Sequence, residues 1–317
     1  MNWKVVIVDN LSRDSSAINL KWLKNNNLLD GFHEIDIREK HKIEKLISDV
    51  RPQLLIHLAA QVAVTLSVED PLKDFETNLL GTFNILEAVR KTSPDTFIIN
   101  ASTNKVYGDL TQYEIIEHDD SFELKNISDV NESVDLSFHS PYGCSKGSAE
   151  QYVLDYVRTF NLKAISLRQS CIYGSRQFGI EDQGWLAWFT IAQMAGKDIT
   201  IYGNGKQVRD LLYVDDLTNL YHKLYENKVK INGEVFNVGG GIGNSISIIK
   251  ALEKISLKTG YSKKYNFSDE RIGDQKFFVS NNSKLKAMVN WEPTISVDHG
   301  ITKLYDWLLV NSQNMMK

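Results

Sequence analysis

Apolar and polar positions follow two rhythms along the first half of the chain. Compact apolar runs indicate buried strands, and segments with an apolar residue every three or four positions indicate helices between them. Strands are predicted at residues 4–8, 32–35, 53–60, 96–103 and 162–167, and helices near residues 20–24, 39–50, 71–90 and 141–160. This alternation predicts an α/β fold with a doubly wound, mostly parallel sheet covered by helices.

Two stretches depart from this rhythm. Residues 109–140 are acidic and polar, which indicates a solvated excursion with a short hairpin, although a long segment of this kind can also form a flap over a substrate site. After residue 178 the pattern loosens, and a strand at Phe236 runs into the glycines of VGGGIG, interpreted as a turn between domains, before a helix expected from Ser245. We therefore predict a first domain over residues 1–178, to which some later segments return, and a smaller α/β domain over residues 179–317.

The composition is typical of a soluble globular protein, with 42% hydrophobic and 24% charged residues among 317. A formal net charge of −4 gives no reason to expect a nucleic acid or an anionic membrane as a partner. No apolar run approaches the thickness of a bilayer, and the first residues lack the pattern of a signal peptide. The cysteines, Cys144 and Cys171, have no metal-ligand spacing, so we expect a reduced, cytoplasmic protein without a bound metal.

Candidate chemistry lies in the middle of the chain. The segment SPYGCSK places Tyr142 and Lys146 four positions apart on a predicted helix, so both side chains project from one face. A lysine cation one turn away favours the phenolate, and we expect it to lower the pKa of Tyr142. The segment ASTNKVYG ends a predicted strand at Thr103, at the edge where open α/β sheets bind ligands. Thr103 would there hold the hydroxyl that Tyr142 deprotonates.

These two segments resemble the extended short-chain dehydrogenase/reductase group of sugar-nucleotide epimerases and dehydratases. The resemblance continues along nearly the whole chain, in VDNLSR at residues 8–13, RQF at 176–178, DQGW at 182–185 and GNGKQVRD at 203–210. It implies a Rossmann-like NAD-binding domain over residues 1–178 and a mainly nucleotide-sugar-binding domain over residues 179–317. The members that this chain resembles most are isomerases that invert C2 of a CDP-linked sugar by transient oxidation, in the biosynthesis of lipopolysaccharide O-antigen.

Neighbouring activities can be weighed from the residues after Thr103. The related 4,6-dehydratases carry Asp-Glu at the next two positions, as the acid and base that remove water. Here these positions are Asn104 and Lys105, neither of which is a carboxylic acid, so a dehydratase is disfavoured. A UDP-sugar 4-epimerase and a truncated, non-catalytic remnant stay open as alternative interpretations.

The resemblance also implies roles for single residues. The implied catalytic residues are Thr103, Tyr142 and Lys146. The residues implied in NAD binding are Asp9, Asn10, Asp36, Ile37, Leu58, Ala59, Ala60, Tyr142 and Lys146. The residues implied in binding a nucleotide-diphosphate sugar are Asn78, Thr103, Asn104, Arg209 and Arg271, with the two arginines on the diphosphate. The family further implies a homo-oligomer.

The first strand raises a separate expectation. The strand predicted at residues 4–8 is followed directly by Asp9. In the family that this chain resembles, the second strand is followed by an acid that contacts a ribose hydroxyl. The resemblance therefore implies a preceding strand, a glycine turn for the pyrophosphate and a helix, roughly 25 residues in all. Without that strand, residues 4–8 and 54–57 would lose hydrogen-bond partners. We hypothesise that Met1 corresponds to an internal methionine of a longer protein, and we expect poor stability and weak NAD binding from the chain as written.

Overall fold

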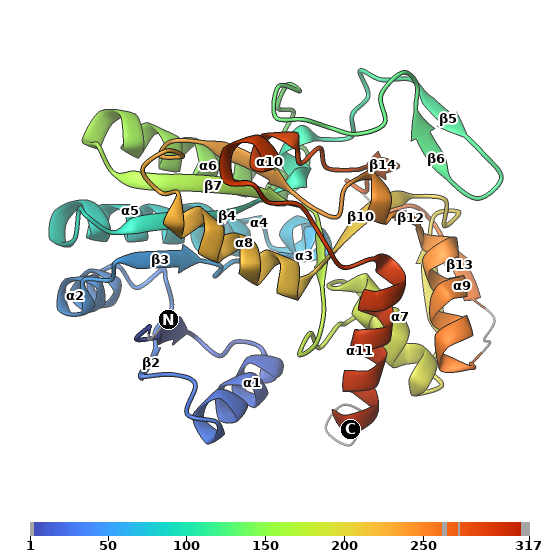
Figure 1. Ribbon diagram of the computed structural model, residues 1–317, viewed down its shortest axis with the longest axis horizontal. Helices are drawn as coiled ribbons and strands as arrows, with labels where there is room; N and C mark the ends of the chain where they lie inside the picture. The colour runs from blue at the N-terminus through green and yellow to red at the C-terminus, as the bar shows by residue number, and fades with distance from the viewer. Residues whose placement is uncertain (1–2, 262–264, 272, 312–317) are drawn as a thin grey trace.

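The main sheet of the molecule is parallel throughout. The computed structural model describes residues 3–261, 265–271 and 273–311, so Met1 lies outside the described residues. Four strands run in the order β11-β7-β4-β3 (Figure 1). Their bounds are β3 (Leu54–His57), β4 (Phe97–Thr103), β7 (Lys163–Gln169) and β11 (Val235–Val238). The register pairs Thr103 with Gln169, so β4 and β7 end at the same edge of the sheet.

Helices bury this sheet on both faces. The helices are α2 (Lys40–Val50), α5 (Gly81–Thr92) and α6 (Ser140–Phe160) on one face, and α8 (Val214–Glu226) and α10 (Ser283–Val289) on the other. Consecutive residues of β4 serve opposite cores: Ile98 packs with α2 and α5, and Ile99 packs with α8. Strands buried on both faces read as continuous apolar runs, which is why the sequence pattern located β4 and β7. The predicted doubly wound α/β fold is confirmed.

The first two strands form a sheet of their own. β1 (Val6–Asp9) pairs in parallel with β2 (Gly31–Glu34), and helix α1 (Asp14–Asn25) connects them. Within the described residues β1 pairs only with β2, and β3 pairs only with β4, as expected for these two strands. Figure 1 shows this blue lobe set apart from β3. The sheet is therefore interrupted between β1 and β3.

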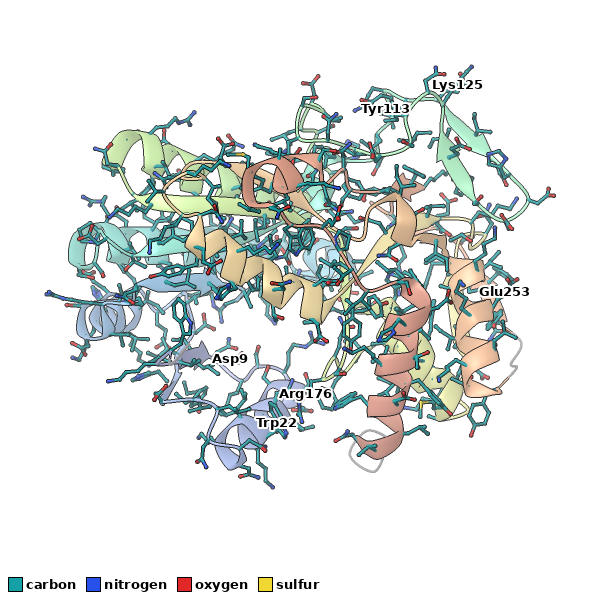
Figure 2. The ribbon with its side chains drawn as sticks, viewed as in Figure 1. Asp9, Trp22, Tyr113, Lys125, Arg176 and Glu253 are labelled. Carbon is teal, nitrogen blue, oxygen red and sulfur yellow. The ribbon has the colours of Figure 1, made fainter. Side chains whose placement is uncertain are left out.

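Helix α1 ties this lobe to the C-terminal part of the chain. The Arg176 guanidinium lies 3.4 Å from the centroid of the Trp22 ring, and the two side chains meet beside α1 in Figure 2. Asn19 Nδ2 donates to the Arg176 carbonyl at 3.2 Å, and the Arg13 guanidinium donates to the Gln183 side chain. The lobe thus reaches the segment that follows β8 instead of contacting only its own sheet.

The C-terminal part is a smaller α/β unit. Its strands are β8 (Cys171–Tyr173), β9 (Ile199–Tyr202), β10 (Val208–Tyr213), β12 (Ser245–Ser247), β13 (Tyr265–Ser268) and β14 (Phe277–Phe278). Its helices are α7 (Trp185–Met194), α9 (Ile248–Thr259) and α11 (Val297–Asn311), which share one apolar core. The expected helix start at Ser245 is wrong. Residues 245–247 pair with β10 instead, and Ser247 caps α9 by accepting from Lys250 N.

The polar excursion contains the predicted hairpin. β5 (Ile115–Glu117) and β6 (Phe122–Leu124) pair antiparallel. Phe122 N donates to the Lys206 carbonyl at 2.9 Å, and Lys206 forms an ion pair with Glu117 at 2.8 Å. No residue from 109 to 140 lines the cavity beside Lys105 that is described below, so the structure favours the hairpin over the flap.

The predicted helix over residues 71–90 is divided. α3 (Val64–Glu69) and α4 (Pro71–Phe75) precede a π-helical turn, η1 (Glu76–Leu80), which leads into α5. Asp70 caps α4 by accepting from Lys73 N at 3.0 Å. Such π-helical turns are frequent at functional sites, and this one positions Asn78. None of the helices in the described ranges has the length and apolar character needed to cross a bilayer.

The glycines that follow β11 allow close packing of the backbone against β10. A Cβ on Gly239 would collide with the Asp210 carboxylate, and one on Gly240 would collide with the Leu211 carbonyl. Asp210 Oδ2 instead accepts from Gly241 N at 3.0 Å and from Ser280 N at 3.1 Å. The glycines therefore let the segment that follows β11 lie directly against β10.

Candidate active site

The three residues singled out as catalytic meet where β4 ends and α6 begins. α6 starts at Ser140 with Pro141 in its first turn, a position where proline costs no hydrogen bond. Thr103, Tyr142 and Lys146 are 5%, 8% and 4% exposed. The Thr103 hydroxyl is close enough to the Tyr142 hydroxyl to favour its ionised form, and it donates to Asn104 Oδ1 at 3.3 Å. The tertiary structure thus joins a strand end to a helix face, as the sequence pattern predicted.

The expected lowering of the Tyr142 pKa is wrong for this structure. Burial raises the pKa of Tyr142 to about 12, and the nearby Thr103 hydroxyl opposes this only in part. Burial also lowers the pKa of Lys146 to about 8. Spacing on a helix brings a cation near a phenol, but the removal of both groups from water disfavours their charged forms.

A buried ion pair fixes α6 against the sheet behind the triad. Glu150, one turn after Lys146, accepts from Arg168 on β7 at 2.6 Å, and neither side chain is more than 6% exposed. Arg168 also donates to the Tyr107 hydroxyl at 2.8 Å, and Tyr107 donates to Asn237 on β11 at 2.8 Å. This network links α6, β7, η2 (Asn104–Tyr107) and β11, so the helix that carries Tyr142 has a defined place.

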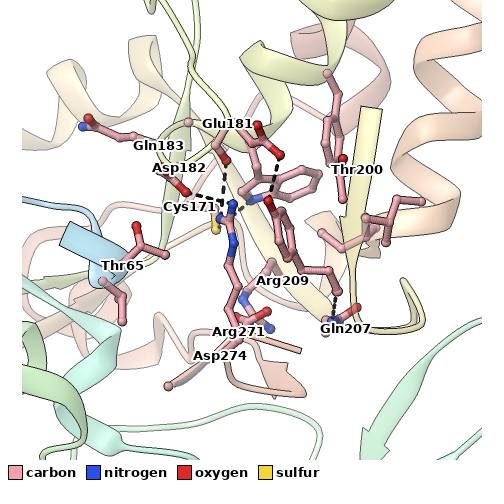
Figure 3. Close-up of a pocket in the computed structure, with 18 of the residues that line it drawn as sticks. Thr65, Cys171, Glu181, Asp182, Gln183, Thr200, Gln207, Arg209, Arg271 and Asp274 are labelled. Carbon is pink, nitrogen blue, oxygen red and sulfur yellow. Dashed lines mark hydrogen bonds and ion pairs between the residues drawn. The ribbon is translucent and has the colours of Figure 1, made fainter. Parts of the chain in front are cut away.

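Beside Lys105 opens a cavity of about 250 Å³ between the two parts of the chain (Figure 3). The side chains of Lys105, Arg209 and Arg271 give it three cations. Acidic residues from two segments, 181–182 and 274, face these cations. A cavity with convergent guanidinium groups suits the oxygen atoms of phosphates, which arginine binds in bidentate fashion.

Arg271 and Arg209 are held in different ways. Arg271 pairs with Asp182 at 2.8 Å, and its guanidinium lies 3.7 Å from the centroid of the Tyr202 ring (Figure 3). Arg209 is nearly buried and donates to Asp274 Oδ1 at 2.7 Å and to the Gln275 carbonyl at 2.5 Å. Arg271 is partly exposed at the wall of the cavity, whereas Arg209 is buried in its floor.

Asp274 joins two of the cations. Its Oδ1 lies 2.7 Å from Arg209 and 3.6 Å from Lys105 Nζ, and Lys105 also donates to the Gly273 carbonyl at 3.0 Å. Although burial by itself favours the neutral acid, Arg209 and Lys105 together hold the pKa of Asp274 below its usual range. Lys105 is thus a cation bound within the protein, at the position where the resemblance to the 4,6-dehydratases would imply a glutamate.

The residues expected at the adenosine end of NAD lie together on the N-terminal lobe. Asn10 Nδ2 donates to Asp36 Oδ2 at 2.8 Å, and Asp9 at the end of β1 accepts from Leu11 N at 2.7 Å. The Arg38 guanidinium lowers the pKa of Asp36 to about 2, so this carboxylate is charged. Asp9 and Asp36 thus present charged or polar acceptors that fit ribose hydroxyls.

The remaining cofactor candidates divide between surface and core. Ile37 is 7% exposed and packs where a Cβ on Gly81 would collide with its side chain, so it belongs to the core between α2 and α5. Leu58 and Ala59 are exposed and Ala60 is half-buried directly after β3. The exposure of Leu58 and Ala59 leaves the end of β3 open to a flat ligand.

Two polar groups at the same edge of the sheet fit the nicotinamide end of NAD. Ser102 is 5% exposed on β4, and its Oγ has no hydrogen-bond partner. Within the described residues no hydrogen bond or ion pair reaches Lys146 Nζ. A buried hydroxyl and a buried ammonium without partners are costly unless a ligand satisfies them. Ribose and carboxamide groups supply such partners, so the residues present fit the cofactor.

Two residues expected on the substrate are engaged within the protein. Asn78 is 1% exposed; it donates to the Gln61 carbonyl at 2.9 Å and accepts from Gln61 N at 2.8 Å. Asn104 Nδ2 donates to Gln275 Oε1 at 3.1 Å. The structure therefore places Asn78 in the wall behind the site, and Asn104 between β4 and the segment that carries Asp274.

Sequence reasoning missed Asp274, Asp182 and Tyr202 as members of the cavity. Asp182 is the first residue of the DQGW segment, which was considered only for its resemblance to the family. Asp274 lies three residues after Arg271, and only the arginine was considered. The sequence did contain a signal for both acids, because Asp182 is close in sequence to Trp185 and Asp274 is close in sequence to Arg271. Tyr202 gave none, because an aromatic residue at a strand end is ordinary packing until a guanidinium is seen above it.

Comparisons with known proteins agree with this geometry. The family described as GDP-mannose 4,6 dehydratase matches residues 1–304. CDP-paratose 2-epimerase of Salmonella typhi is 42% identical over 309 residues, covering 96% of this chain and 91% of the relative. UDP-glucose 4-epimerase of Thermotoga maritima, solved with UDP-glucose, has a TM-score of 0.82 at 29% identity and covers 98% of this chain and 92% of its own. UDP-glucuronic acid 4-epimerase of Bacillus cereus, solved with UDP-glucuronic acid and NAD, has a TM-score of 0.82 at 27% identity, with coverages of 97% and 91%.

Proposed function

This chain belongs to the GDP-mannose 4,6-dehydratase family, within the extended short-chain dehydrogenases/reductases, and on that premise we propose that it is an NAD-dependent nucleotide-sugar epimerase. Its substrate is CDP-paratose and its product CDP-tyvelose, two sugars that differ in configuration at C2. Identity of 42% over 96% of the chain to a CDP-paratose 2-epimerase supports this substrate. The product would serve the synthesis of a lipopolysaccharide sugar in the cytoplasm.

The observation that carries the proposal is the position of the triad beside a cationic cavity. Thr103 at the end of β4 lies beside Tyr142 on α6, and Lys105, two residues after Thr103, lines the cavity with Arg209 and Arg271. The two arginines bind the diphosphate, which leaves the sugar to reach the triad. Asp274 and Asp182 must then exchange their pairing with the arginines for other partners in the complex.

Each residue of the triad has one task in the reaction. The chemistry that NAD supplies when bound is the transient removal and return of a hydride at C2, together with a positive ring charge that favours a phenolate nearby. Tyr142 takes the proton of the C2 hydroxyl, Thr103 hydrogen-bonds the same oxygen, and Lys146 stabilises the phenolate. After the 2-keto sugar has turned within the site, Tyr142 would return its proton to the C2 oxygen. The reaction has no net oxidation.

Two other activities are distinguished by specific residues. Asn104 and Lys105 are tied to Gln275 and Gly273, and neither supplies the acid or base for loss of water. A UDP-sugar 4-epimerase uses the same triad, and the likeness to two solved 4-epimerases keeps it as the second candidate. The nucleotide and the reacting carbon are therefore the features that an experiment must decide.

Incubation of the purified protein with CDP-paratose tests the proposal directly. With NAD supplied in excess, because the chain as written is expected to bind it weakly, we expect NMR signals of tyvelose in the product. Unchanged paratose with cofactor-loaded protein would contradict the assignment of substrate, and conversion of UDP-glucose to UDP-galactose would support the 4-epimerase. Absence of both NAD binding and turnover would favour a non-catalytic protein.

We also propose that the active protein is a symmetric homodimer, the commonest closed assembly. Four rings form a continuous strip on α5 and α6, with neighbouring centroids 4.8 to 6.5 Å apart. This aromatic strip consists of Phe83, Tyr152, Tyr156 and Phe160, of which Tyr152 and Phe160 are 43% and 44% exposed.

Residues 1–178 would form the NAD-binding domain and residues 179–317 mainly the sugar-nucleotide domain, with β11 returning to the first sheet.

A further inference from the structure

Asp74 is a buried carboxylate that the proposed reaction does not use. It lies on α4 with 0% exposure. Its Oδ1 accepts from Gln61 Nε2 at 2.9 Å and from Asn78 Nδ2 at 3.0 Å, and its Oδ2 accepts from Ser145 Oγ at 2.5 Å. All three donors are neutral, so direct contacts satisfy the hydrogen bonds of the carboxylate without cancelling its charge. Burial of a carboxylate without a paired cation costs free energy, so we expect a nearby cation that its charge could stabilise.

That cation is Lys146, the residue after Ser145. Lys146 is 4% exposed, and the described contacts give its ammonium no direct partner. Two carboxylates act on it through space, Asp74 from α4 and Glu150 from the next turn of α6. Glu150 is already neutralised by Arg168 at 2.6 Å. Asp74 is therefore the carboxylate whose charge is free to balance Lys146.

The other titratable groups around Lys146 do not take this role. His57 on β3 is buried and its Nε2 meets Thr82 Oγ1 at 2.9 Å, while burial lowers the pKa of His57 to about 3, so the ring is neutral. Tyr142 on α6 is neutral in this structure because burial raises its pKa to about 12. The local balance is therefore one cation, Lys146, against one uncompensated anion, Asp74.

We propose that Asp74 is a positioning residue that keeps Lys146 charged and holds the first turns of α6, through Ser145, in place for proton transfer by Tyr142. The inference rests on the proposed function for its catalytic meaning, and on the packing of α4 against α6 for its geometry. Burial alone disfavours the ammonium, and a carboxylate within the same low-dielectric region offsets that cost. Burial raises the pKa of Asp74 above its usual range, whereas the hydrogen bonds from Ser145 and Gln61 and the charge of Lys146 favour the ionised carboxylate.

Two variants separate the charge of Asp74 from its hydrogen bonds. Asp74→Asn keeps the size of the side chain and removes the charge, whereas Ser145→Ala removes the link to α6 and keeps the charge. The titration midpoint of Lys146 is measured on the holoprotein by competitive acylation across pH, with mass spectrometry of the peptide that contains it. We expect Asp74→Asn to lower this midpoint by about one pH unit, a tenfold loss of proton affinity. Ser145→Ala should leave the midpoint unchanged.

The alkaline limb of the pH–rate profile should move with the midpoint in Asp74→Asn and stay fixed in Ser145→Ala. Should Asp74→Asn not fold, the double variant Asp74→Asn/Gln61→Glu carries the test, because it exchanges amide and carboxylate across one hydrogen bond and restores a charge beside Lys146. A midpoint near that of the wild type in this variant supports the proposal. An unchanged midpoint in Asp74→Asn would overturn it and leave Asp74 a structural residue. The midpoint needs no turnover, so failure of the proposed reaction would show separately.

Discussion

At the scale of single residues, Tyr142 shows how burial competes with helix spacing. Four positions on α6 bring Lys146 to the same face, yet Tyr142 has a pKa of about 12 because both groups have left water. The phenol becomes a base only when further positive charge enters the site, which in the proposed reaction comes with the oxidised cofactor. A resting site of this kind holds its proton until the ligands are in place.

Tyr142→Phe tests this role with little change in shape. The substitution removes the proton acceptor and keeps the ring, so we expect kcat to fall by about 100-fold or more. Affinity for CDP, measured calorimetrically, should change by less than about threefold, since the arginines that bind the diphosphate are untouched. Tyr152→Phe, on the exposed face of the same helix, is the matched control. Near-normal turnover in Tyr142→Phe would remove Tyr142 from the mechanism.

At the scale of elements, α6 depends on polar contacts that cross its buried face. Glu150 faces Arg168 on β7, and Ser145 faces Asp74 on α4. Hydrogen bonds and ion pairs are directional, so these pairs add to apolar packing in fixing the register of α6 against the sheet and against α4. Tyr142 and Lys146 inherit their positions from these contacts, so loss of a distant pair should disturb the triad.

We expect Glu150→Ala to lower the free energy of unfolding by about 3–5 kcal/mol, because it leaves the Arg168 guanidinium buried without its carboxylate. Urea unfolding followed by circular dichroism gives the value. Asp49→Ala removes an exposed partner of Lys45 in α2 and should cost less than about 1 kcal/mol. A loss below about 1 kcal/mol in Glu150→Ala would show that the pair does not anchor α6.

At the scale of the whole molecule, the site lies where several parts of the chain converge. β4 and α6 supply the triad, β10 and the segment around Asp274 supply the floor of the cavity, and residues 181–185 supply its wall. Helix α1 contacts that same wall through Arg13 and Gln183. The N-terminal lobe and the cavity therefore share a physical connection, although β1 and β3 belong to separate sheets.

The aromatic strip makes a prediction at this scale. Light scattering after gel filtration should give a mass about twice the 36.1 kDa of one chain, because a second copy covers the strip. Tyr152→Glu places a charge in that contact and should yield the monomer. Tyr261→Glu changes a ring of similar exposure after α9 and should stay dimeric. A wild-type protein that runs as a monomer would contradict the proposed assembly.

The sequence by itself determined the order of the buried strands and proposed Thr103, Tyr142 and Lys146 as one group. Strands buried on both faces leave continuous apolar runs, and the helix spacing of Tyr142 and Lys146 became informative only together with the strand-end Thr103. Boundaries were less secure where a second partner intervened. The expected helix start at Ser245 failed because residues 245–247 pair with β10, a contact between segments more than thirty residues apart that no local pattern records.

The tertiary structure alone decided charge and environment. Arg209 and Asp274 are 65 residues apart in the chain, and their 2.7 Å contact follows from the meeting of β10 with a distant loop. Asp74 gains its meaning in the same way, because burial and the proximity of Lys146 are both products of how α4 packs on α6. A pKa depends on the surrounding dielectric and charges, which belong to the folded molecule and not to a residue type. The sequence therefore names the chemical groups of this site, and packing sets their protonation.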